Sequence, residues 1–259
     1  MFLIYIVIKL NFCYTLSYYM EKSSNFGKLY IVATPIGNLS DMTFRAVEIL
    51  KSVDCILCED TRTTKKLLDH YQIQNKTMSF HTHSGLAKVS EIKEMIREGK
   101  SLALVSDAGT PCISDPGVML VAELRKEFDL PAQAGDEIII SPIPGASALI
   151  SALSASGLPA HEFSWKGFVP HKKGRETFFK EITETPTTVI FYESVHRFMK
   201  TLESLNSIIP DRQMVVAREI TKMFEEFKKG TVVEIFDYYT QNPDKVRGEF
   251  VIIVGPIKS

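Results

Sequence analysis

The sequence predicts an α/β protein in which a doubly wound, mostly parallel sheet is followed by a second α/β domain with a mixed sheet. Short apolar runs alternate with amphipathic stretches from Leu29 onward, as expected for strands joined by crossover helices. The early runs lack polar alternation, so helices should cover both faces of their strands. With 45% hydrophobic and 24% charged residues over 259 positions, the composition excludes a collagen, a disordered tail protein and a polytopic membrane protein.

The charge balance and the cysteine count indicate which partners and which cellular compartment to expect. Thirty basic side chains against thirty-one acidic ones give a formal net charge of −1, so a nucleic-acid partner would have to be held by a local patch of cations. Four cysteines are too few for a disulfide scaffold at this length, which indicates a reducing cytoplasm.

The first domain is expected to span residues 28–144. Its predicted strands are Leu29–Thr34, Cys55–Glu59, Met78–Phe80, Ser101–Ser106 and Glu137–Ser141. Helices are expected between these strands, one capped by Asp41 and another opened by Asp115 and Pro116. Their predicted inward faces are Phe44, Val47 and Leu50; Leu86, Val89, Ile92 and Ile96; and Val118, Val121, Leu124 and Phe128.

The second domain is expected to span residues 145–259, after the chain is punctuated at Pro144-Gly145. Its predicted strands are longer and more aromatic: Phe163–Phe168, Thr187–Tyr192, Met214–Ile220, Thr231–Phe236 and Glu249–Val254. Residues 1–27 are expected to lie outside the core. The apolar run Phe2–Ile8 is too short to span a bilayer, and it is explained either by a targeting role or by translation that starts at Met20.

Three loops at the carboxyl ends of first-domain strands are the candidate ligand site, because open α/β sheets bind ligands at that edge. The turn Thr34–Leu39 lacks the glycine spacing that seats a pyrophosphate, which disfavours a dinucleotide and leaves a plain turn open. The loop Ser106–Gly117 is longer than ordinary connections. Within it, Asp107 is placed either to bind a ligand or to close an Asx-turn. Pro142–Ser147 would complete the cleft.

Seven sequence blocks occur in an order that resembles a known family. They are LYIVATPIGNLSD (Leu29–Asp41), CEDTR (Cys58–Arg62), ALVSDAGTPCISDPG (Ala103–Gly117), PIPGASA (Pro142–Ala148), FYES (Phe191–Ser194), AREITK (Ala217–Lys222) and GE (Gly248–Glu249). Together they resemble the bacterial ribosomal RNA small-subunit methyltransferase I family of the tetrapyrrole methylase-like superfamily. The resemblance runs from about Leu29 to Pro256.

The resemblance implies a class III S-adenosylmethionine-dependent methyltransferase that modifies the ribose 2′-oxygen of a cytidine in 16S rRNA. It also implies two α/β domains around the S-adenosylmethionine cleft, a homodimer, and the small ribosomal subunit as partner. A sulfonium ligand calls for a carboxylate and open backbone groups, so we expect no metal. We also expect no membrane, because the apolar run near the N-terminus is too short to span a bilayer. The expected cofactor-binding residues are Pro35, Gly37, Asp107, Gly109, Ile113, Ser114, Pro144, Ser147, Ala148, Tyr192 and Ala217.

The acceptor side of the site is predicted from charge and aromatic content. Lys166, Lys172, Lys173 and Arg175 accompany Trp165 and Phe168, a combination that binds RNA phosphates and stacks bases, with a solvated basic turn as the alternative. Arg62 would clamp a phosphate, unless its segment only caps a helix. The candidates for the general base are Glu193, His196, Glu219 and Lys222, of which Glu193 and Glu219 are preferred; ion pairing in the fold is the alternative.

Weaker motifs have ordinary explanations as well. His81 and His83 form an H-x-H pair without a further ligand at metal spacing, and His83-Ser84 would otherwise face RNA or solvent. Cys55 and Cys58 are read as buried strand residues. The insert Asp129–Asp136 is expected to be a surface loop, and the C-terminal helical segment of many relatives is not expected after Ser259.

Two other functions remain open from the sequence. A tetrapyrrole methylase of the same fold would not need lysines beside aromatics at residues 165–175, and it would typically carry a glycine-rich first loop where this chain has TPIGNL. An RNA- or nucleotide-binding module without catalysis would keep the basic segment but would not consume the cofactor. The exact nucleotide, the general base and the assembly state of the substrate are not fixed by the sequence.

Overall fold

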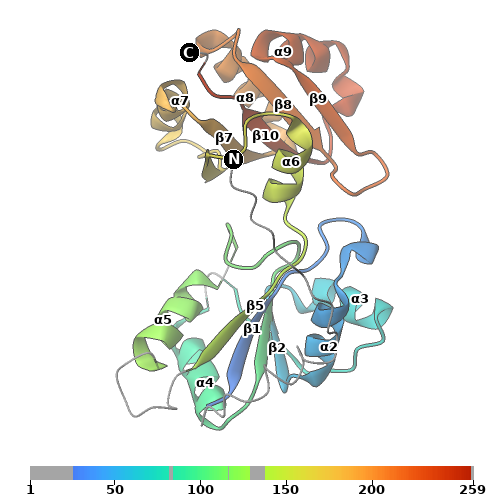
Figure 1. Ribbon diagram of the computed structural model, residues 1–259, viewed down its shortest axis with the longest axis vertical. Helices are drawn as coiled ribbons and strands as arrows, with labels where there is room; N and C mark the ends of the chain where they lie inside the picture. Colours follow the sequence, from blue (N-terminus) through green and yellow to red (C-terminus); the bar gives the residue numbers. More distant parts are fainter. Residues whose placement is uncertain (1–25, 82–83, 116, 129–137, 258–259) are drawn as a thin grey trace, which may run out of the picture.

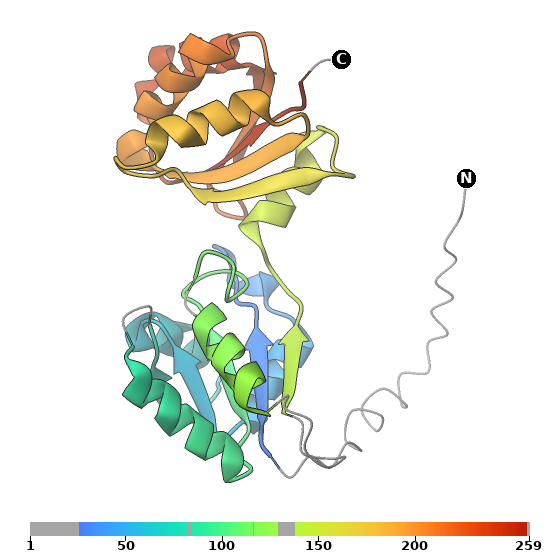
Figure 2. The same ribbon diagram turned by 90° about the vertical axis from the view of Figure 1, so that its left-hand side faces the viewer.

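The computed structural model describes residues 26–81, 84–115, 117–128 and 138–257, which form two lobes, each built on a five-stranded sheet. Figure 2 shows one lobe above the other, joined by the segment that leads from β5 (Ile139–Ile143) into α6 (Ala148–Ser156). We propose the domain boundary in this segment, at Pro144-Gly145. The predicted fold class, two α/β domains, is confirmed.

The first sheet is entirely parallel, with the order β3-β2-β4-β1-β5. Its strands besides β5 are β1 (Lys28–Val32), β2 (Cys55–Cys58), β3 (Thr77–Ser79) and β4 (Leu102–Val105), each within a few residues of its predicted position. Because strand order reverses beside β1, the carboxyl ends of β1 and β4 lie at a switch point, where ligands bind in folds of this class.

Helices cover both faces of this sheet, as Figure 1 shows. On one face, α4 (Leu86–Arg97) and α5 (Val118–Phe128) pack on a cluster that includes Leu29 and Leu104. On the other, α2 (Phe44–Ser52) and α3 (Thr61–His70) pack on a cluster that includes Val32. The absence of polar alternation in these strands is explained by this double cover.

Two predicted helix starts were wrong. Asp41 ends a short 3-10 helix, η1 (Leu39–Asp41), and α2 is capped instead by Thr43, whose hydroxyl accepts a hydrogen bond from the Ala46 amide at 3.2 Å. Helix α5 begins at Val118, so Asp115 lies too far upstream to be its cap.

Three residues predicted to face the core are exposed. Phe44, Leu86 and Val118 are 93%, 74% and 60% exposed, although later residues of the same helices, such as Leu50, Ile92 and Leu124, are buried as expected. Each is the first residue of its helix. The predicted helical spacing of the inward residues was therefore right, but the first residue assigned to each inward face was wrong.

The second sheet is mixed, with the order β6-β7-β10-β8-β9. Strands β6 (Phe163–Phe168) and β7 (Thr188–Ser194) are parallel, whereas β10 (Glu249–Val254), β8 (Gln213–Arg218) and β9 (Glu226–Thr231) pair antiparallel. The register of β6 shifts between Trp165 and Phe168, where Gly167 has a φ of +67°. Such a bulge redirects the side chain that follows it, and Phe168 is exposed.

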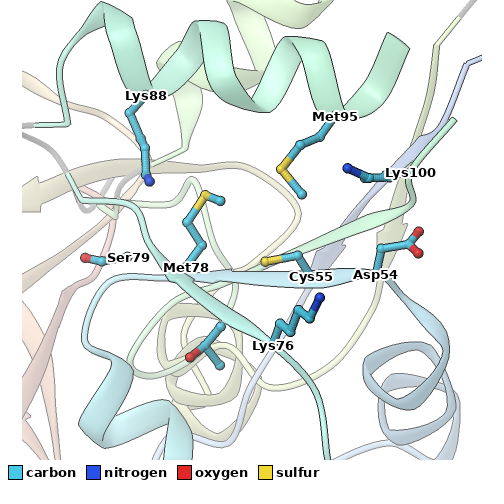
Figure 3. A pocket seen from close by; sticks show the side chains of 9 residues that line it. Asp54, Cys55, Lys76, Met78, Ser79, Lys88, Met95 and Lys100 are labelled. Atoms are coloured by element: carbon cyan, nitrogen blue, oxygen red, sulfur yellow. The ribbon is translucent and has the colours of Figure 1, made fainter. Parts of the chain in front are cut away.

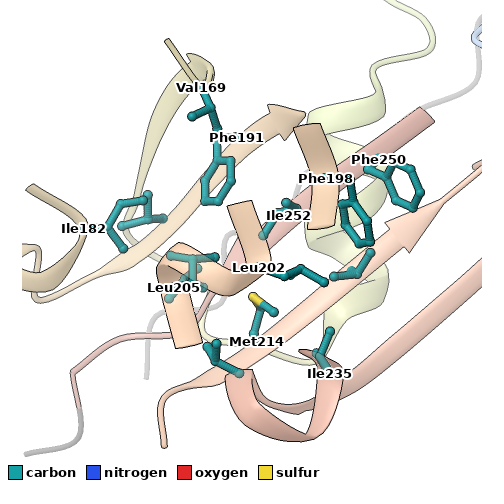
Figure 4. Close-up of a cluster of buried hydrophobic side chains, with 14 of the residues drawn as sticks. Val169, Ile182, Phe191, Phe198, Leu202, Leu205, Met214, Ile235, Phe250 and Ile252 are labelled. Atoms are coloured by element: carbon teal, nitrogen blue, oxygen red, sulfur yellow. The ribbon is translucent and has the colours of Figure 1, made fainter. Parts of the chain in front are cut away.

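The two faces of the second sheet have different partners. Helices α7 (Arg175–Glu184), α8 (Val195–Ile208) and α9 (Val232–Gln241) cover one face over an aromatic core that includes Phe191, Phe198 and Phe250 (Figure 4). Helix α6 covers the other face with Leu149, Ala152 and Leu153. Consecutive residues of β7 therefore point to different environments.

The strand predicted at Thr231–Phe236 was wrong, because this segment is the start of α9. Thr231 and Glu234 form a reciprocal capping box, and Val232, Ile235 and Tyr239 are buried at helical spacing. The β-branched residues favoured a strand locally, but the cap and the packing of one helical face decide the outcome. The missing fifth strand is β9, which the sequence prediction did not include.

Several predictions fall on residues outside the described ones: Phe2–Tyr19, His83, Pro116 and the insert Asp129–Asp136. Within the described part of the chain, no helix combines the length and the apolar character needed to cross a membrane.

Candidate active site

The turn after β1 is fastened to the long loop after β4 by backbone hydrogen bonds. The Thr34 amide donates to the Gly109 carbonyl at 2.9 Å, and the Gly109 amide donates to the Thr34 carbonyl at 3.0 Å. The Thr34 hydroxyl also donates to the Ser106 carbonyl at 3.1 Å. Thr34 begins the first predicted loop but was not one of the predicted cofactor-binding residues, because a bridge between distant loops leaves no mark in the local sequence.

The loop after β5 joins the same assembly. The Thr110 hydroxyl donates to the Ala146 carbonyl at 3.0 Å. A Cβ atom on Gly145 would lie only 2.9 Å from the Cβ of Ala33, so this close approach requires glycine. The three loops that the sequence singled out thus meet at the carboxyl edge of the first sheet, and with them Pro35, Gly37, Asp107, Gly109, Pro144 and Ser147.

The long loop reaches the second lobe in a strained conformation. Cys112 and Ser114 have φ values of +69° and +65°, which side chains other than glycine rarely adopt. A Cβ on Gly167, in the bulge of β6, would lie 3.6 Å from the Ser114 hydroxyl oxygen. Ile113 between them is 42% exposed. Strain of this kind persists where the surrounding structure over-determines it, often at ligand sites.

Predicted cofactor residues of the second lobe have different degrees of access. The Tyr192 hydroxyl accepts a hydrogen bond from the Leu149 amide at 3.0 Å, next to Ala148 at the start of α6. Burial raises the pKa of Tyr192 to about 12, so the hydroxyl stays protonated at neutral pH. Ala217 is fully buried, and the prediction that it contacts a ligand is not supported by this arrangement.

Carboxylates gather at the mouth of the first-lobe loops. Burial, together with the charges of Glu59 and Asp107, raises the pKa of Asp115 to about 6. The Asp107 carboxylate accepts a hydrogen bond from the Asp60 amide at 3.2 Å, which links it to the start of α3 and differs from the Asx-turn considered above. This edge of the first lobe is therefore rich in negative charge.

Arg62 extends from the same edge. Its side chain is 87% exposed, and its guanidinium pairs with Asp60 at 2.7 Å. Asp60 also accepts from the Arg62 amide as the N-cap of α3, and this pairing lowers the pKa of Asp60 to about 2. Asp60 therefore caps α3, and the exposed guanidinium of Arg62 still has N–H donors available to a ligand.

A charged group lies opposite, at the second-lobe edge. The Lys222 ammonium contacts Glu219 at 2.9 Å and Glu249 at 2.8 Å, and Glu219 also accepts from the Glu249 amide at 3.0 Å. Burial alone would raise the pKa of Glu219, but the bonds from Lys222 and the Glu249 amide keep it below its ordinary value. A Cβ on Gly37 would lie 2.5 Å from Cγ of Lys222, so this group touches the first predicted loop.

The structure does not place Glu193 at this edge. Its side chain is fully buried on the α7 and α8 face of β7, where it pairs with Arg197 at 2.9 Å and Arg175 at 3.7 Å. Tyr192, the preceding residue, lies on the opposite face in the cluster beneath α6. The choice of Glu193 as base and of Arg175 as an RNA contact is therefore corrected: both belong to a buried ion network. For Glu193 this is the alternative that the sequence left open, ion pairing in the fold.

The remaining basic residues are on or near the loop between β6 and α7. Lys166 pairs with Glu181 at 2.7 Å. Lys172 and Lys173 are exposed and have no ion-pair partner among the described residues. Phe168 stands before them, 54% exposed, with its ring 5.3 Å from that of Tyr192 in an edge-to-face contact.

A cavity of about 520 Å³ lies elsewhere, lined by Asp54, Cys55, Lys76, Thr77, Met78, Ser79, Lys88, Met95 and Lys100 (Figure 3). Asp54, Lys76 and Lys100 come within two residues before β2, β3 and β4, at the amino ends of the strands. Because the predicted ligand loops leave the carboxyl ends, this cavity lies at the wrong edge for the candidate site.

Metal ligation finds no support in the described part of the chain, where no group of three or more His, Cys, Asp or Glu side chains is arranged to hold an ion. Cys55 and Cys58 are buried free thiols whose pKa values are raised by burial, as the strand interpretation required. The site offers carboxylates, backbone groups and one ammonium cluster.

Comparisons with known proteins identify the family of the chain. The profile of the family described as Tetrapyrrole (Corrin/Porphyrin) Methylases matches residues 28–235. The chain is 44% identical over 232 residues to the ribosomal RNA small subunit methyltransferase I of Bacillus subtilis (strain 168), covering 89% of this chain and 76% of the relative. It is 45% identical over 228 residues to the protein of that name from Vibrio cholerae serotype O1, covering 87% and 76%.

Solved structures share the fold at low identity. Diphthine synthase superposes with a TM-score of 0.64 at 14% identity, over 89% of this chain and 90% of that one. Cobalt precorrin-4 methyltransferase gives 0.62 at 17% identity, over 88% and 94%. A uroporphyrin-III C-methyltransferase from Thermus thermophilus, complexed with S-adenyl homocysteine, gives 0.58 at 18%, over 88% and 97%. These likenesses establish the architecture.

Proposed function

Because the chain belongs to the tetrapyrrole methylase family, we propose that it uses S-adenosylmethionine to methylate the ribose 2′-oxygen of a cytidine in small-subunit ribosomal RNA. The observation that carries the proposal is the junction of three loops around the Thr34–Gly109 bridge, facing an ammonium and carboxylate group on the second lobe. Relatives at 44% and 45% identity bear the name of a ribosomal RNA methyltransferase, which supports the choice of RNA over a tetrapyrrole.

The loop junction suits a cationic nucleoside ligand. Gly109, with a φ of +85°, brings the backbone close to the place where a ligand would lie, and an added Cβ there would be 3.3 Å from Ile36. The carboxylates of Asp107 and Asp115 supply negative charge for a sulfonium without a metal. The proposed binding residues are Pro35, Gly37, Asp107, Gly109, Ile113, Ser114, Pro144, Ser147, Ala148 and Tyr192.

The protein would contribute to catalysis mainly by positioning the acceptor hydroxyl. When bound, S-adenosylmethionine supplies a methyl group on a sulfonium, a carbon already activated for displacement. The protein must hold the acceptor hydroxyl in line with that carbon and accept its proton. We propose that the Glu219 carboxylate accepts this proton, because Lys222 and the Glu249 amide keep the carboxylate ionised and fix its orientation.

RNA would be held beside this group. We propose that Lys172 and Lys173 neutralise phosphates, that Arg62 binds the phosphate near the acceptor, and that Phe168 offers a stacking surface for an unpaired base. Lys166 contributes less, because Glu181 already neutralises it. This arrangement differs from a global basic field, in keeping with the net charge of −1.

We also propose a cytoplasmic homodimer. Free thiols at Cys55, Cys58 and Cys112 fit a reducing compartment, and two copies of the basic loop would grip a ribosomal subunit better than one. Light scattering at micromolar concentration should return twice the chain mass of 29.2 kDa. A monomer at that concentration would remove the dimer from the proposal.

The decisive experiment measures release of S-adenosylhomocysteine with three acceptors: 30S subunits, a precorrin and no acceptor. Release with 30S subunits alone supports the proposal, and mapping of the methylated nucleotide in rRNA from cells with and without the gene identifies the position. Release with the precorrin would favour tetrapyrrole methylation. RNA binding without any release would favour a non-catalytic binding protein.

A further inference from the structure

A buried ion network joins the two ends of the basic loop between β6 and α7. The Glu193 carboxylate contacts Arg197 at 2.9 Å and Arg175 at 3.7 Å, and it accepts from the Thr201 hydroxyl at 2.7 Å and the Ser194 amide at 2.7 Å. Its side chain is fully buried, and the two arginine side chains are 17% and 13% exposed. The network lies on the face of β7 that α7 and α8 cover, opposite the face that carries Tyr192.

Each arginine holds one end of the loop. Arg197 donates to the Val169 carbonyl at 2.7 Å, at the point where the chain leaves β6. Arg175 is the first residue of α7, and it donates to the Thr201 hydroxyl at 2.9 Å while its guanidinium stacks over Phe179 at 4.9 Å. Both ends of the intervening segment, residues 170–174, are thereby tied to one carboxylate.

The segment between these anchors has few restraints of its own. His171, Lys172, Lys173 and Gly174 are exposed, and the three side chains make no ion pair or side-chain hydrogen bond among the described residues. The one backbone bond across the loop runs from the Arg175 amide to the Lys172 carbonyl at 3.2 Å. The segment is therefore held at its two ends, by the contacts that Arg197 and Arg175 make on the buried side.

A structural role alone does not account for this network. The neighbouring inward positions of β7 are Val189 and Phe191, and an apolar residue at 193 would pack there without the desolvation of three charges. One carboxylate between two guanidiniums also leaves an excess of positive charge, and Nη1 of Arg175 has no hydrogen-bond partner. In some proteins, buried ionic networks fix a particular geometry although they add little net stability.

We infer that Glu193 is a positioning residue that, through Arg175 and Arg197, presets the Val169–Gly174 loop as a clamp for the RNA backbone. The inference rests on the proposed function for the identity of the ligand, and on the ion network for the mechanism. A loop fixed before binding loses less conformational entropy on the RNA, so the network adds to affinity without touching the ligand.

The test compares Glu193→Gln and Thr201→Val with a matched control, Thr231→Ala. Thr201→Val removes the hydroxyl that bridges Arg175 and Glu193 but keeps every charge, so it reports on the network even if Glu193→Gln folds poorly. Thr231→Ala breaks the capping box of α9, which destabilises the same lobe away from the loop. Binding of a fluorescent single-stranded oligoribonucleotide and of S-adenosylmethionine is measured for each variant well below its melting temperature.

We expect the dissociation constant for the oligoribonucleotide to rise about tenfold in both network variants, from the entropy of the freed side chains and loop. Its dependence on salt should keep the parent slope, because Lys172 and Lys173 are still present. Affinity for S-adenosylmethionine should stay at the parent value, and the control should match the parent in all three measurements. Unchanged RNA affinity in Thr201→Val, or an equal loss in Thr231→Ala, overturns the inference.

Tryptic cleavage after Lys172 and Lys173 separates this inference from the proposed function. The network variants should be cleaved there several-fold faster than the parent and the control, whether or not the protein methylates RNA. Equal cleavage rates overturn the preset loop. If the parent releases no S-adenosylhomocysteine with 30S subunits while the cleavage rates differ as expected, the proposed function fails and the loop anchoring stands.

Discussion

The facing edges of the two lobes differ in what shapes them: backbone contacts in the first lobe and paired charged side chains in the second. The first-lobe edge is shaped mainly by backbone, through the Thr34–Gly109 bridge, the close approach of Gly145 to Ala33 and the positive φ values of Cys112 and Ser114, with carboxylates at its mouth. The second-lobe edge is made of paired side chains, with Lys222 between Glu219 and Glu249. An added methyl group should therefore damage the first edge most, and a changed charge should damage the second.

The largest effect is expected from Gly109→Val. Its φ of +85° strains any β-branched residue, and a Cβ placed 3.3 Å from Ile36 would push the added methyl groups into the loop junction. Calorimetry should show at least a hundredfold loss of S-adenosylmethionine affinity, which corresponds to about 2.7 kcal/mol. Gly99→Val is the matched control, because Gly99 has a φ of +81° with nothing within 4 Å of an added Cβ. Unchanged affinity in Gly109→Val would mean that the pocket lies elsewhere.

The second effect tests the side-chain edge. Glu219→Gln should slow single-turnover methylation about a hundredfold at saturating RNA and cofactor, the usual contribution of a general base. Because the pKa of Glu219 lies below its ordinary value, the parent rate should not fall from this group between about pH 8 and about pH 6. Glu249→Gln, which alters the exposed contact of Lys222, should have a smaller effect. A Glu219→Gln rate equal to the parent rate excludes this base.

The contrast between the edges also explains what the sequence could predict. The three loops were found because glycine, proline and aspartate mark turns wherever they occur, and the topology of a parallel sheet brings strand ends together. Most strands followed from their short apolar runs for a similar reason. These features are local, or they follow from a rule that holds for the whole class of fold.

The errors have the opposite origin. Glu193 and Arg175 look like surface charges in the sequence, and only the packing of α7 and α8 on β7 makes them partners in a buried network. The segment VVEIF has strand propensity, but Thr231 and Glu234 stand at capping-box spacing, which indicates a helix. The partners of Glu193 and Arg175 depend on tertiary packing, whereas the start of α9 has a local signal in the sequence.

The third prediction concerns the basic loop. Reversal of both exposed charges, Lys172→Glu with Lys173→Glu, should raise the dissociation constant for RNA about 10- to 100-fold near physiological salt and lower the salt slope by about 1.4, as expected for two lost contacts to a single strand. Cofactor affinity should not change. The matched control is Lys51→Glu with Lys126→Glu, which alters the net charge equally near the amino ends of the first-lobe strands. An equal loss in both pairs would show that only net charge matters.

The smallest effect concerns the carboxylates of the first-lobe edge. Burial and the charge of Glu59 raise the pKa of Asp115 to about 6, so between about pH 4 and pH 6 the folded protein holds a proton that the unfolded chain releases. Stability contributed by this proton is present at low pH and is lost as the pH rises through about 6. Ionised Asp115 therefore destabilises the free protein at pH 7. Asp115→Asn should raise the melting temperature there by about 2–4 °C, allowing for the partial exposure of the side chain.

The same variant should weaken the stabilisation that the cofactor provides. A cationic ligand favours the ionised carboxylate, so S-adenosylmethionine should raise the melting temperature of the parent more at pH 7 than at pH 5, and this difference should shrink in Asp115→Asn. Asp69→Asn, on the exposed side of α3, should leave both the stability and the pH dependence unchanged. The rise in melting temperature that S-adenosylmethionine produces in the parent could instead be the same at both pH values. In that case the carboxylates do not face the sulfonium, and the first-lobe edge recognises its ligand through backbone groups alone.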